Sequence, residues 1–260
     1  MTSQEVEDCA AAALWRARLS VAQIDPAELA GLADAEAAYR VQRLNVERRL
    51  GEGGTVTGRK IGLTSAAVQA QLNVDEPDYG FLFADMDVSG QAEVSTRPLA
   101  QPRIEAEIAF VVARDLPEDL TPDRAASYVD HAVVAAEIVD SAVLDWRIGL
   151  RETVADNASA GRYALGSQRL SLASFDPTAA VMRMTRDGQE VSTGAGAACL
   201  GGPLLALCWL ARAAAARGVP VRAGEVVLSG ALGPMIPVSA GDCFEIRVDA
   251  VAPCPSVSRR

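Results

Sequence analysis

Two glutamates one residue apart, Glu105 and Glu107, are the residues of this sequence whose spacing most directly suggests chemistry. They lie in the segment 103–110, which otherwise alternates like a half-buried β-strand, with Ile104 and Ile108 among its apolar positions. Because successive strand side chains point to opposite faces, both carboxylates project from the same face. Two adjacent anions repel unless a proton or a cation lies between them, and a hard divalent cation is a common solution. The alternative is an exposed strand whose Glu-x-Glu pair meets solvent.

A third acid, Glu137, lies within the apolar run 133–139. Burying an unpaired carboxylate is costly, so Glu137 requires a partner. If its segment is a strand beside the first two glutamates, three carboxylates converge and could hold Mg²⁺ or Mn²⁺, with positions left for water or substrate. The alternative partner is an arginine such as Arg103 or Arg147.

The chain has one histidine, His131, and one lysine, Lys60. A single histidine excludes a histidine cluster, and we expect His131 to be a packed or surface residue in or at the end of a helix. All other basic residues are arginine, so the lysine either marks a place that requires a compact ammonium or is a surface remnant.

Composition narrows the class of protein further. The 260 residues are half hydrophobic, enough for a substantial core in a globular fold, and the net charge of −10 disfavours a nucleic-acid or anionic-membrane surface. The five cysteines form no C-x-x-C pair and the N-terminus shows no signal-peptide pattern, so we expect a cytoplasmic protein with reduced thiols. The most apolar run, 199–215, is interrupted by Gly-Gly-Pro and predicts a buried helix. The tryptophans are expected to pack in the core or at interfaces.

The elements that must position these residues follow from the hydrophobic pattern. The first fifty residues are expected to be helical, with a helix beginning after Asp25 and another over 34–50 that ends at a glycine-rich stop. We therefore divide the chain into a helical portion, 1–54, and a β-rich catalytic domain, 55–260. Strands are predicted over 58–65, 104–112, 133–139, 226–229 and 244–248; helices over 66–72, 122–130 and 204–217; and a loop over 75–80.

Several ordered segments together resemble a known family. They are Gly58–Ser65, Glu76–Gly80, Arg103–Glu107, Glu137–Ser141, Val154–Ser159 and Val227–Met235. In this order and spacing, the chain resembles the 2-keto-4-pentenoate (2-hydroxypentadienoate) hydratases and the related 4-oxalocrotonate decarboxylases of the fumarylacetoacetate hydrolase superfamily, from about Leu29 to near Val248. The resemblance implies an α+β fold, a mixed rolled β-sandwich with an N-terminal helical portion.

The same resemblance implies roles for individual residues. Glu105, Glu107 and Glu137 are the expected ligands of Mg²⁺ or Mn²⁺. Lys60, Asp78 and Glu76 are the candidate catalytic residues, with either acid able to move the proton. Candidate substrate-binding residues are Ser65, Asp156, Asn157, Ser229 and Gly230.

The implied activity is metal-dependent addition of water to 2-hydroxypenta-2,4-dienoate or a close analogue, giving a 4-hydroxy-2-oxo acid in aromatic catabolism. The alternatives are a decarboxylase on the same scaffold, which a pocket arginine facing a second substrate carboxylate would favour, an acylpyruvate hydrolase and a non-catalytic partner subunit. The resemblance also implies a homo-oligomer and allows a complex with a related decarboxylase or aldolase.

Overall fold

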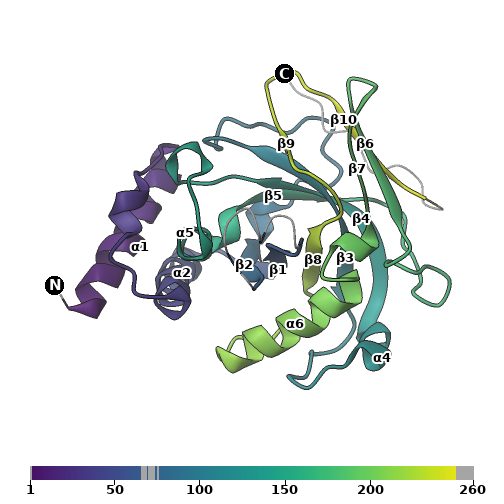
Figure 1. Cartoon of the computed structure of the whole chain (residues 1–260), viewed down its shortest axis with the longest axis horizontal. Helices are drawn as coiled ribbons and strands as arrows, with labels where there is room; N and C mark the ends of the chain where they lie inside the picture. Colours follow the sequence, from purple (N-terminus) through teal and green to yellow (C-terminus); the bar gives the residue numbers. More distant parts are fainter. Residues whose placement is uncertain (1, 66–68, 70–73, 75, 250–260) are drawn as a thin grey trace.

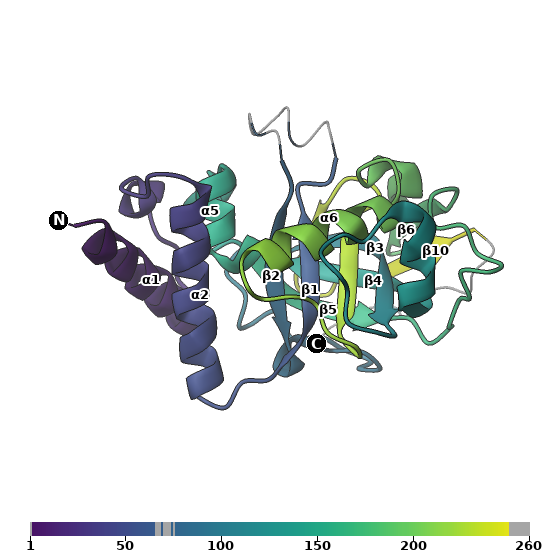
Figure 2. The ribbon, with the colours of Figure 1, turned by 90° about the horizontal axis from the view of Figure 1, so that it is seen from below.

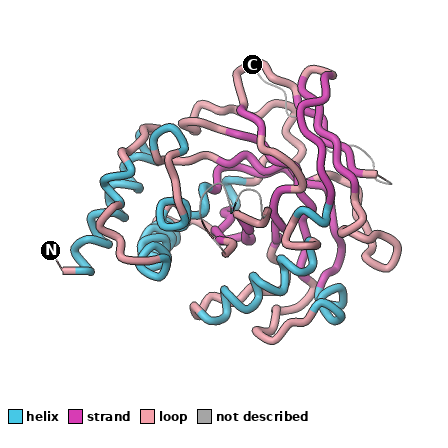
Figure 3. Tube along the Cα trace, in the orientation of Figure 1, coloured by secondary structure: helices cyan, strands magenta, loops and turns pink. Residues whose placement is uncertain are grey.

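The structure, a computed structural model, describes residues 2–65, 69, 74 and 76–249. It combines N-terminal helices with a curled mixed sheet, a second small sheet and further helices (Figure 1, Figure 3). The α-helices are α1 (Ser3–Ser20), α2 (Ala35–Gly51), α4 (Pro122–Ala125), α5 (Leu150–Ala155) and α6 (Pro203–Ala216). The strands are β1 (Val56–Gly62), β2 (Asp78–Phe83), β3 (Arg103–Val112), β4 (Val129–Val139), β5 (Ala160–Leu165), β6 (Val181–Arg186), β7 (Gln189–Ala195), β8 (Val226–Ala231), β9 (Ile236–Pro237) and β10 (Phe244–Val248).

The N-terminal helices lie beside one end of the main sheet (Figure 1, Figure 2). Helix α2 begins at the side-chain cap of Asp34, whose carboxylate accepts a hydrogen bond from the Ala37 amide. Its buried Gln42 side chain donates hydrogen bonds to the carbonyls of Tyr79 in β2 and Val154 in α5. Helix α2 therefore holds a strand and a helix that both carry residues of the site described below.

The main sheet has the strand order β2-β1-β8-β3-β4-β5, with β9 also paired to β3. Strand β3 is antiparallel to β4, in a register that sets Glu105 directly opposite Glu137. Strand β1 is antiparallel to β2 and parallel to β8, so Lys60 lies between Gly80 and Leu228. The two glutamate strands and the lysine strand are thus separated only by β8.

The face of β3 and β4 opposite the glutamates is apolar and packs toward the second sheet, whose order is β10-β6-β7. Ile104, Ile138 and Phe244 are all buried and border one small shared cavity. Because the apolar face of β3 is buried against the second sheet, its other face is the one that presents the carboxylates.

Helix α6 packs on β8 and α4. Together with the short 3₁₀ turn before it, it forms the stretch Gly196–Ala216, which by length and composition alone could cross a membrane, and half of which is buried inside the protein. Such burial is what a core helix gives, in agreement with the expected buried helix.

Most predicted strands and the helices over 34–50 and 204–217 are confirmed within a few residues, whereas three expectations are wrong. The helix expected after Asp25 is only the four-residue 3₁₀ turn Pro26–Leu29. The helix expected over 122–130 shortens to α4 and a 3₁₀ turn, which places His131 in β4. The loop expected over 75–80 ends early, because Asp78 already begins β2. The helix expected over 66–72 falls on residues of which only Gln69 is described.

Candidate metal centre and active-site cavity

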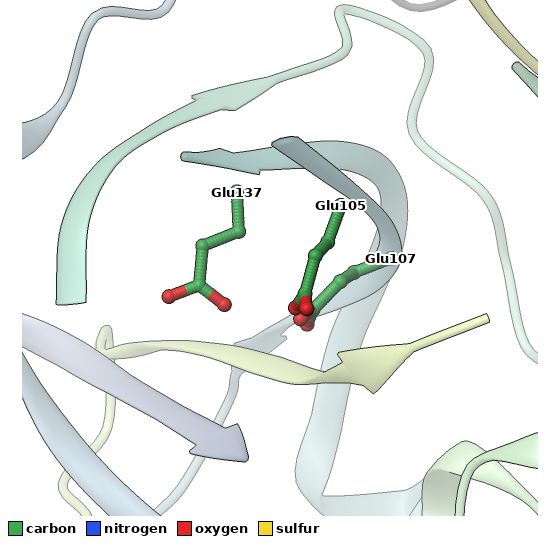
Figure 4. Close-up of side chains that lie close together, drawn as sticks. All are labelled: Glu105, Glu107 and Glu137. Atoms are coloured by element: carbon green, nitrogen blue, oxygen red, sulfur yellow. The ribbon is translucent and has the colours of Figure 1, made fainter. Parts of the chain in front are cut away.

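Glu105, Glu107 and Glu137 bring their carboxyl groups together on one face of β3 and β4 (Figure 4). One carboxylate oxygen from each lies within 4.8 Å of the others. Glu107 and Glu137 are fully buried, and Glu105 is partly buried. The condition stated from the sequence, that the Glu137 segment is a strand beside Glu105 and Glu107, is therefore met, and three acids cluster.

The cluster has fewer partners than its charge requires. Glu107 Oε2 accepts a hydrogen bond from the Gly230 amide at 2.7 Å, but its Oε1 and both oxygens of Glu137 have no hydrogen-bond partner. Burial, opposed by Lys60 and reinforced by neighbouring acids, raises the pKa of Glu105 to about 7. Burial and the other two glutamates raise the pKa of Glu107 well above its ordinary value, and burial also raises the pKa of Glu137. The hydrogen bonds to the three acids thus compensate only a small part of the charge that full ionisation would give them.

Lys60 is the one described cation within ion-pair distance of the cluster. Its ammonium lies 3.3 Å from Glu137 Oε1 and donates a hydrogen bond to the Ala158 carbonyl at 3.0 Å. Burial opposes its charge, but the surrounding acids, Glu137 first, outweigh burial and raise the pKa of Lys60. The lysine is therefore charged and buried, and the alternative of a surface remnant is wrong. The arginine alternatives for Glu137 are also wrong, since Arg103 stacks on Trp146 and Arg147 pairs with Asp25.

Asp78 lies beside Lys60 at the start of β2. Its Oδ2 accepts a hydrogen bond from the Thr153 hydroxyl at 3.0 Å, whereas its Oδ1 is buried without a partner. Burial raises the pKa of Asp78, and Lys60 and Thr153 partly offset the shift. Gly62 faces Asp78 across the strand pair, and a Cβ at Gly62 would overlap Asp78 Oδ1. The carboxylate thus occupies space that only a glycine leaves free.

These groups open onto a cavity of about 470 Å³. Its polar wall includes Lys60, Asp78, Glu105, Thr153 and Ser159, and its apolar wall includes Ile61, Val139, Trp146, Ile148, Pro234 and Met235. No arginine is among its described lining residues. Of the other predicted residues, Ser65 lines the cavity, whereas Glu76 is exposed and is not among the lining residues.

The predicted substrate-binding residues Ser229 and Gly230 lie behind the cluster. The Ser229 hydroxyl is buried without a partner, and its carbonyl accepts a hydrogen bond from the Cys199 thiol at 2.7 Å. Gly230 has a φ of +113°, and a Cβ there would overlap the Thr64 hydroxyl. Gly230 thus orients Glu107 through its amide in a conformation that favours glycine.

Asp156 and Asn157 do not reach this cavity. Asp156 accepts hydrogen bonds from the Arg18 side chain and the Ala142 amide, and burial raises its pKa to about 6 despite that arginine. Asn157 exchanges two hydrogen bonds with the backbone of Phe81. Both side chains therefore bond to other segments of the chain and do not contact the cavity.

The cluster fits a hard divalent cation. Three converging carboxylates with unpartnered buried oxygens supply the donors that Mg²⁺ prefers, and the one nearby ammonium balances only part of their charge. A bound cation would remove the cost of holding these oxygens in the interior.

Comparison with known proteins bears on this site directly. The family model for the C-terminal domain of fumarylacetoacetate hydrolase matches residues 52–256. A 2-keto-4-pentenoate hydratase from Paraburkholderia xenovorans is 48% identical over 253 residues, which span 96% of this chain and 94% of that protein. The chain belongs to the 2-keto-4-pentenoate hydratase family.

Other members and neighbours of the 2-keto-4-pentenoate hydratase family agree with this assignment. The TodF product hydratase of Pseudomonas putida F1 is 51% identical over 232 residues, 89% of this chain and 87% of that protein. The 4-oxalocrotonate decarboxylase of Pseudomonas putida G7, whose structure contains magnesium and adipate, superposes with a TM-score of 0.93 at 31% identity, covering 100% of this chain and 99% of that one. The predicted α+β fold of the fumarylacetoacetate hydrolase type is confirmed.

Three cavity residues of this 2-keto-4-pentenoate hydratase family member were not predicted from the sequence. Thr153 contacts Asp78, Ser159 lines the cavity with an unpartnered hydroxyl, and Trp146 forms part of the apolar wall rather than of the core. Ser159 belongs to a segment that resembled the family, which was the available signal. Thr153 and Trp146 carried none, because both lie in helical turns too short to show a periodic pattern.

Proposed function

We propose that this protein is a magnesium-dependent hydro-lyase that adds water to 2-hydroxypenta-2,4-dienoate, the enol of 2-keto-4-pentenoate, or to a close analogue. The product is 4-hydroxy-2-oxopentanoate. The observation that carries the proposal is a cavity in which three undercompensated carboxylates, one buried ammonium and one protonatable carboxyl group converge.

Glu105, Glu107 and Glu137 would hold the metal in this proposal. When bound there, Mg²⁺ would supply Lewis-acid stabilisation of negative charge on the 2-oxygen of the substrate. The Gly230 amide would keep Glu107 turned toward the cluster. The register of β3 against β4 would set the spacing between Glu105 and Glu137.

Lys60 would contribute a fixed positive charge to the same end of the cavity. Its pKa is raised by the acids around it, so the ammonium persists at neutral pH and does not serve as a proton acceptor. A buried charge held by the Ala158 carbonyl and Glu137 is preorganised, and such a charge stabilises an enolate more strongly than water does.

Asp78 would move the protons. Burial raises its pKa, which favours a carboxyl group that can both release and accept a proton, and its unpartnered Oδ1 is free for that role. Ketonisation transfers a proton to C5, which leaves C4 electrophilic. Water then adds its oxygen to C4, and a proton is delivered to C3. We assign this role to Asp78 rather than Glu76, because Glu76 is exposed.

A decarboxylase is the second candidate, since the G7 decarboxylase has the same fold. A dicarboxylate substrate requires a cation for its second carboxylate, and the described lining of the cavity contains no arginine and only one lysine, which lies at the metal end. The apolar residues of the lining favour the hydratase.

The direct test is product analysis. Purified protein, stripped of metal and reloaded with Mg²⁺, should consume 2-hydroxypenta-2,4-dienoate and form 4-hydroxy-2-oxopentanoate. It should release little CO₂ from 2-oxohex-3-enedioate. Rapid CO₂ release from the dicarboxylate with no hydration of the monoacid would establish the decarboxylase instead.

Metal binding is tested separately by thermal unfolding. Mg²⁺ should raise the melting temperature of the wild type, because a ligand that binds only the folded state stabilises it. Glu107→Gln should abolish this increase. Glu7→Gln is the matched control, since Glu7 is also buried but pairs with Arg40 away from the cavity, and it should retain the Mg²⁺ response. An unchanged melting temperature of the wild type with Mg²⁺ would contradict the metal assignment.

A further inference from the structure

Arg103 faces the site without entering the cavity. It lies two residues before Glu105 and four before Glu107 in β3, so its side chain leaves the sheet on the face that carries the carboxylate cluster. Its guanidinium carbon lies 4.5 Å from the ring centre of Trp146, and its Nη1 lies 3.8 Å from Met235 Sδ. Trp146 and Met235 line the cavity, but Arg103 is not among the lining residues.

Trp146 is held firmly in this position. Its indole N–H donates a hydrogen bond to the Gln101 carbonyl at 3.1 Å. The backbone of Asp145 and Trp146 is left-handed, with φ of 56° and 55°, a conformation that is unfavourable for bulky residues and persists only where surrounding contacts enforce it. The indole is thus a fixed part of the wall.

Arg103 has no ion-pair partner in the described part of the chain. Its contacts there are with an aromatic ring and a thioether, neither of which neutralises a guanidinium. Other arginines near the cavity differ in this respect, since Arg147 pairs with Asp25 at 3.3 Å. Glu105 acts on the charge of this partly buried arginine without forming an ion pair with it. The guanidinium therefore remains a latent carboxylate-binding group on the site face of the sheet.

We propose that Trp146 and Met235 screen Arg103 from the cavity and thereby restrict the enzyme to dienoates whose far end is uncharged. This inference rests on the proposed function and specifies its substrate class. A second carboxylate that reached this wall would lose its hydration without gaining a partner, whereas an alkyl end would gain apolar contact. Removal of the screen would turn the same wall into a subsite for dicarboxylates.

The test compares binding of adipate and hexanoate, six-carbon acids that differ only in the second carboxylate. Their dissociation constants are measured by calorimetry with the Mg²⁺-loaded protein. The wild type should bind adipate more weakly than hexanoate. Trp146→Ala should shift the ratio toward adipate by about tenfold or more, the size expected when a buried ionic partner becomes available.

Two double variants identify the group responsible. Adding Arg103→Met to Trp146→Ala should reverse the gain, whereas adding Arg147→Met should leave it, because Arg147 is exposed and does not line the cavity. Met235→Ala opens the other side of the screen and should shift the ratio in the same direction, which keeps the test decisive if Trp146→Ala does not fold. A ratio unchanged in every folded single variant, or a gain that survives Arg103→Met, would overturn the proposal.

Activity separates this inference from the proposed function. If the wild type hydrates 2-hydroxypenta-2,4-dienoate but the ratio of the adipate and hexanoate dissociation constants is the same in all variants, only the screening role is overturned. If this ratio changes in the variants as predicted but the protein has no hydratase activity, only the proposed function is overturned.

Discussion

Glu105, Glu107 and Glu137 face a single neighbouring ammonium, so the ionisation of the cluster must be linked to the binding of a cation. Burial raises the pKa of Glu105 to about 7, above its ordinary 4.5. Without metal, ionisation of such a group destabilises the fold as pH rises through the interval from 4.5 to about 7. When a metal is bound, the glutamates must be ionised, so a rise in pH then stabilises the metal-bound fold.

We therefore expect Mg²⁺ affinity to weaken as pH falls from about 8 to about 6, by roughly tenfold per pH unit for each proton displaced. Calorimetric titration in two buffers of different ionisation enthalpy measures both the affinity and the protons released. The same titration of Glu105→Gln should show a shallower dependence. An affinity independent of pH would contradict the raised pKa of Glu105.

The Thr153 hydroxyl is expected to lower the pKa of Asp78. Its hydrogen bond favours the ionised carboxylate, so Thr153→Val should raise the pKa of Asp78 further. The limb of the kcat/KM profile that Asp78 controls should move by about one pH unit to higher pH. Thr57→Val is the control, because Thr57 bonds Tyr163 away from the cavity and should leave the profile in place. A loss of rate without movement of the limb would indicate only a structural role.

Strand alternation was sufficient to predict that Glu105 and Glu107 share one face, because a strand presents every second side chain on one face. The addition of Glu137 and Lys60 to one site came from the resemblance to the family. Neither was sufficient for Asp156. This residue is acidic and lies in a segment that resembles the family, but its side chain turns toward Arg18. Direction at the end of a six-residue helix depends on contacts with a segment 138 residues away, which no local pattern encodes.

At the scale of elements, the β1–β2 pair determines the geometry of Lys60 and Asp78. The strand β1 was predicted, but the start of β2 was interpreted as a loop because Pro77 and Gly80 are typical of turns. In the structure Gly80 serves close approach instead, since a Cβ there would overlap the Asn157 carbonyl. A glycine can signal either a turn or a close contact, and only the fold distinguishes them.

Gly62→Ala should disturb this pair selectively. The added methyl group would displace the Asp78 carboxylate, and a displacement of about 1 Å typically costs roughly a hundredfold in kcat/KM. Gly51→Ala is the matched control, because a Cβ at Gly51 meets no atom within 4 Å. Steady-state kinetics with 2-hydroxypenta-2,4-dienoate checks the prediction, which equal rates for the two variants would refute.

At the scale of the whole molecule, one arginine joins the N-terminal helix to the catalytic part. Arg18 at the end of α1 bonds Asp140, which follows β4, and Asp156, which follows α5, and both carboxylates are almost completely buried. The division of the chain at residue 54 remains a prediction. Because Arg18 is bonded to both aspartates, we do not expect the helical portion to move independently of the rest of the chain.

Arg18→Met should therefore lower the free energy of unfolding by about 3 kcal/mol, because two buried carboxylates lose their partner. Arg222→Met should change it by about 0.5 kcal/mol or less, since Arg222 and Asp115 form an exposed pair. Urea denaturation measures both. Similar losses in the two variants would show that burial of the aspartates does not amplify the effect of Arg18.

The lone lysine has a practical consequence, because no other side-chain amine in the sequence competes with it for a reagent. Amine-directed reagents have one side-chain target in the entire sequence, and that target is 3% exposed and lies next to the carboxylate cluster. Reductive methylation with isotopically labelled formaldehyde would place a single side-chain NMR probe beside the carboxylate cluster, and its rate would report how readily solvent and reagent reach the buried Lys60 ammonium.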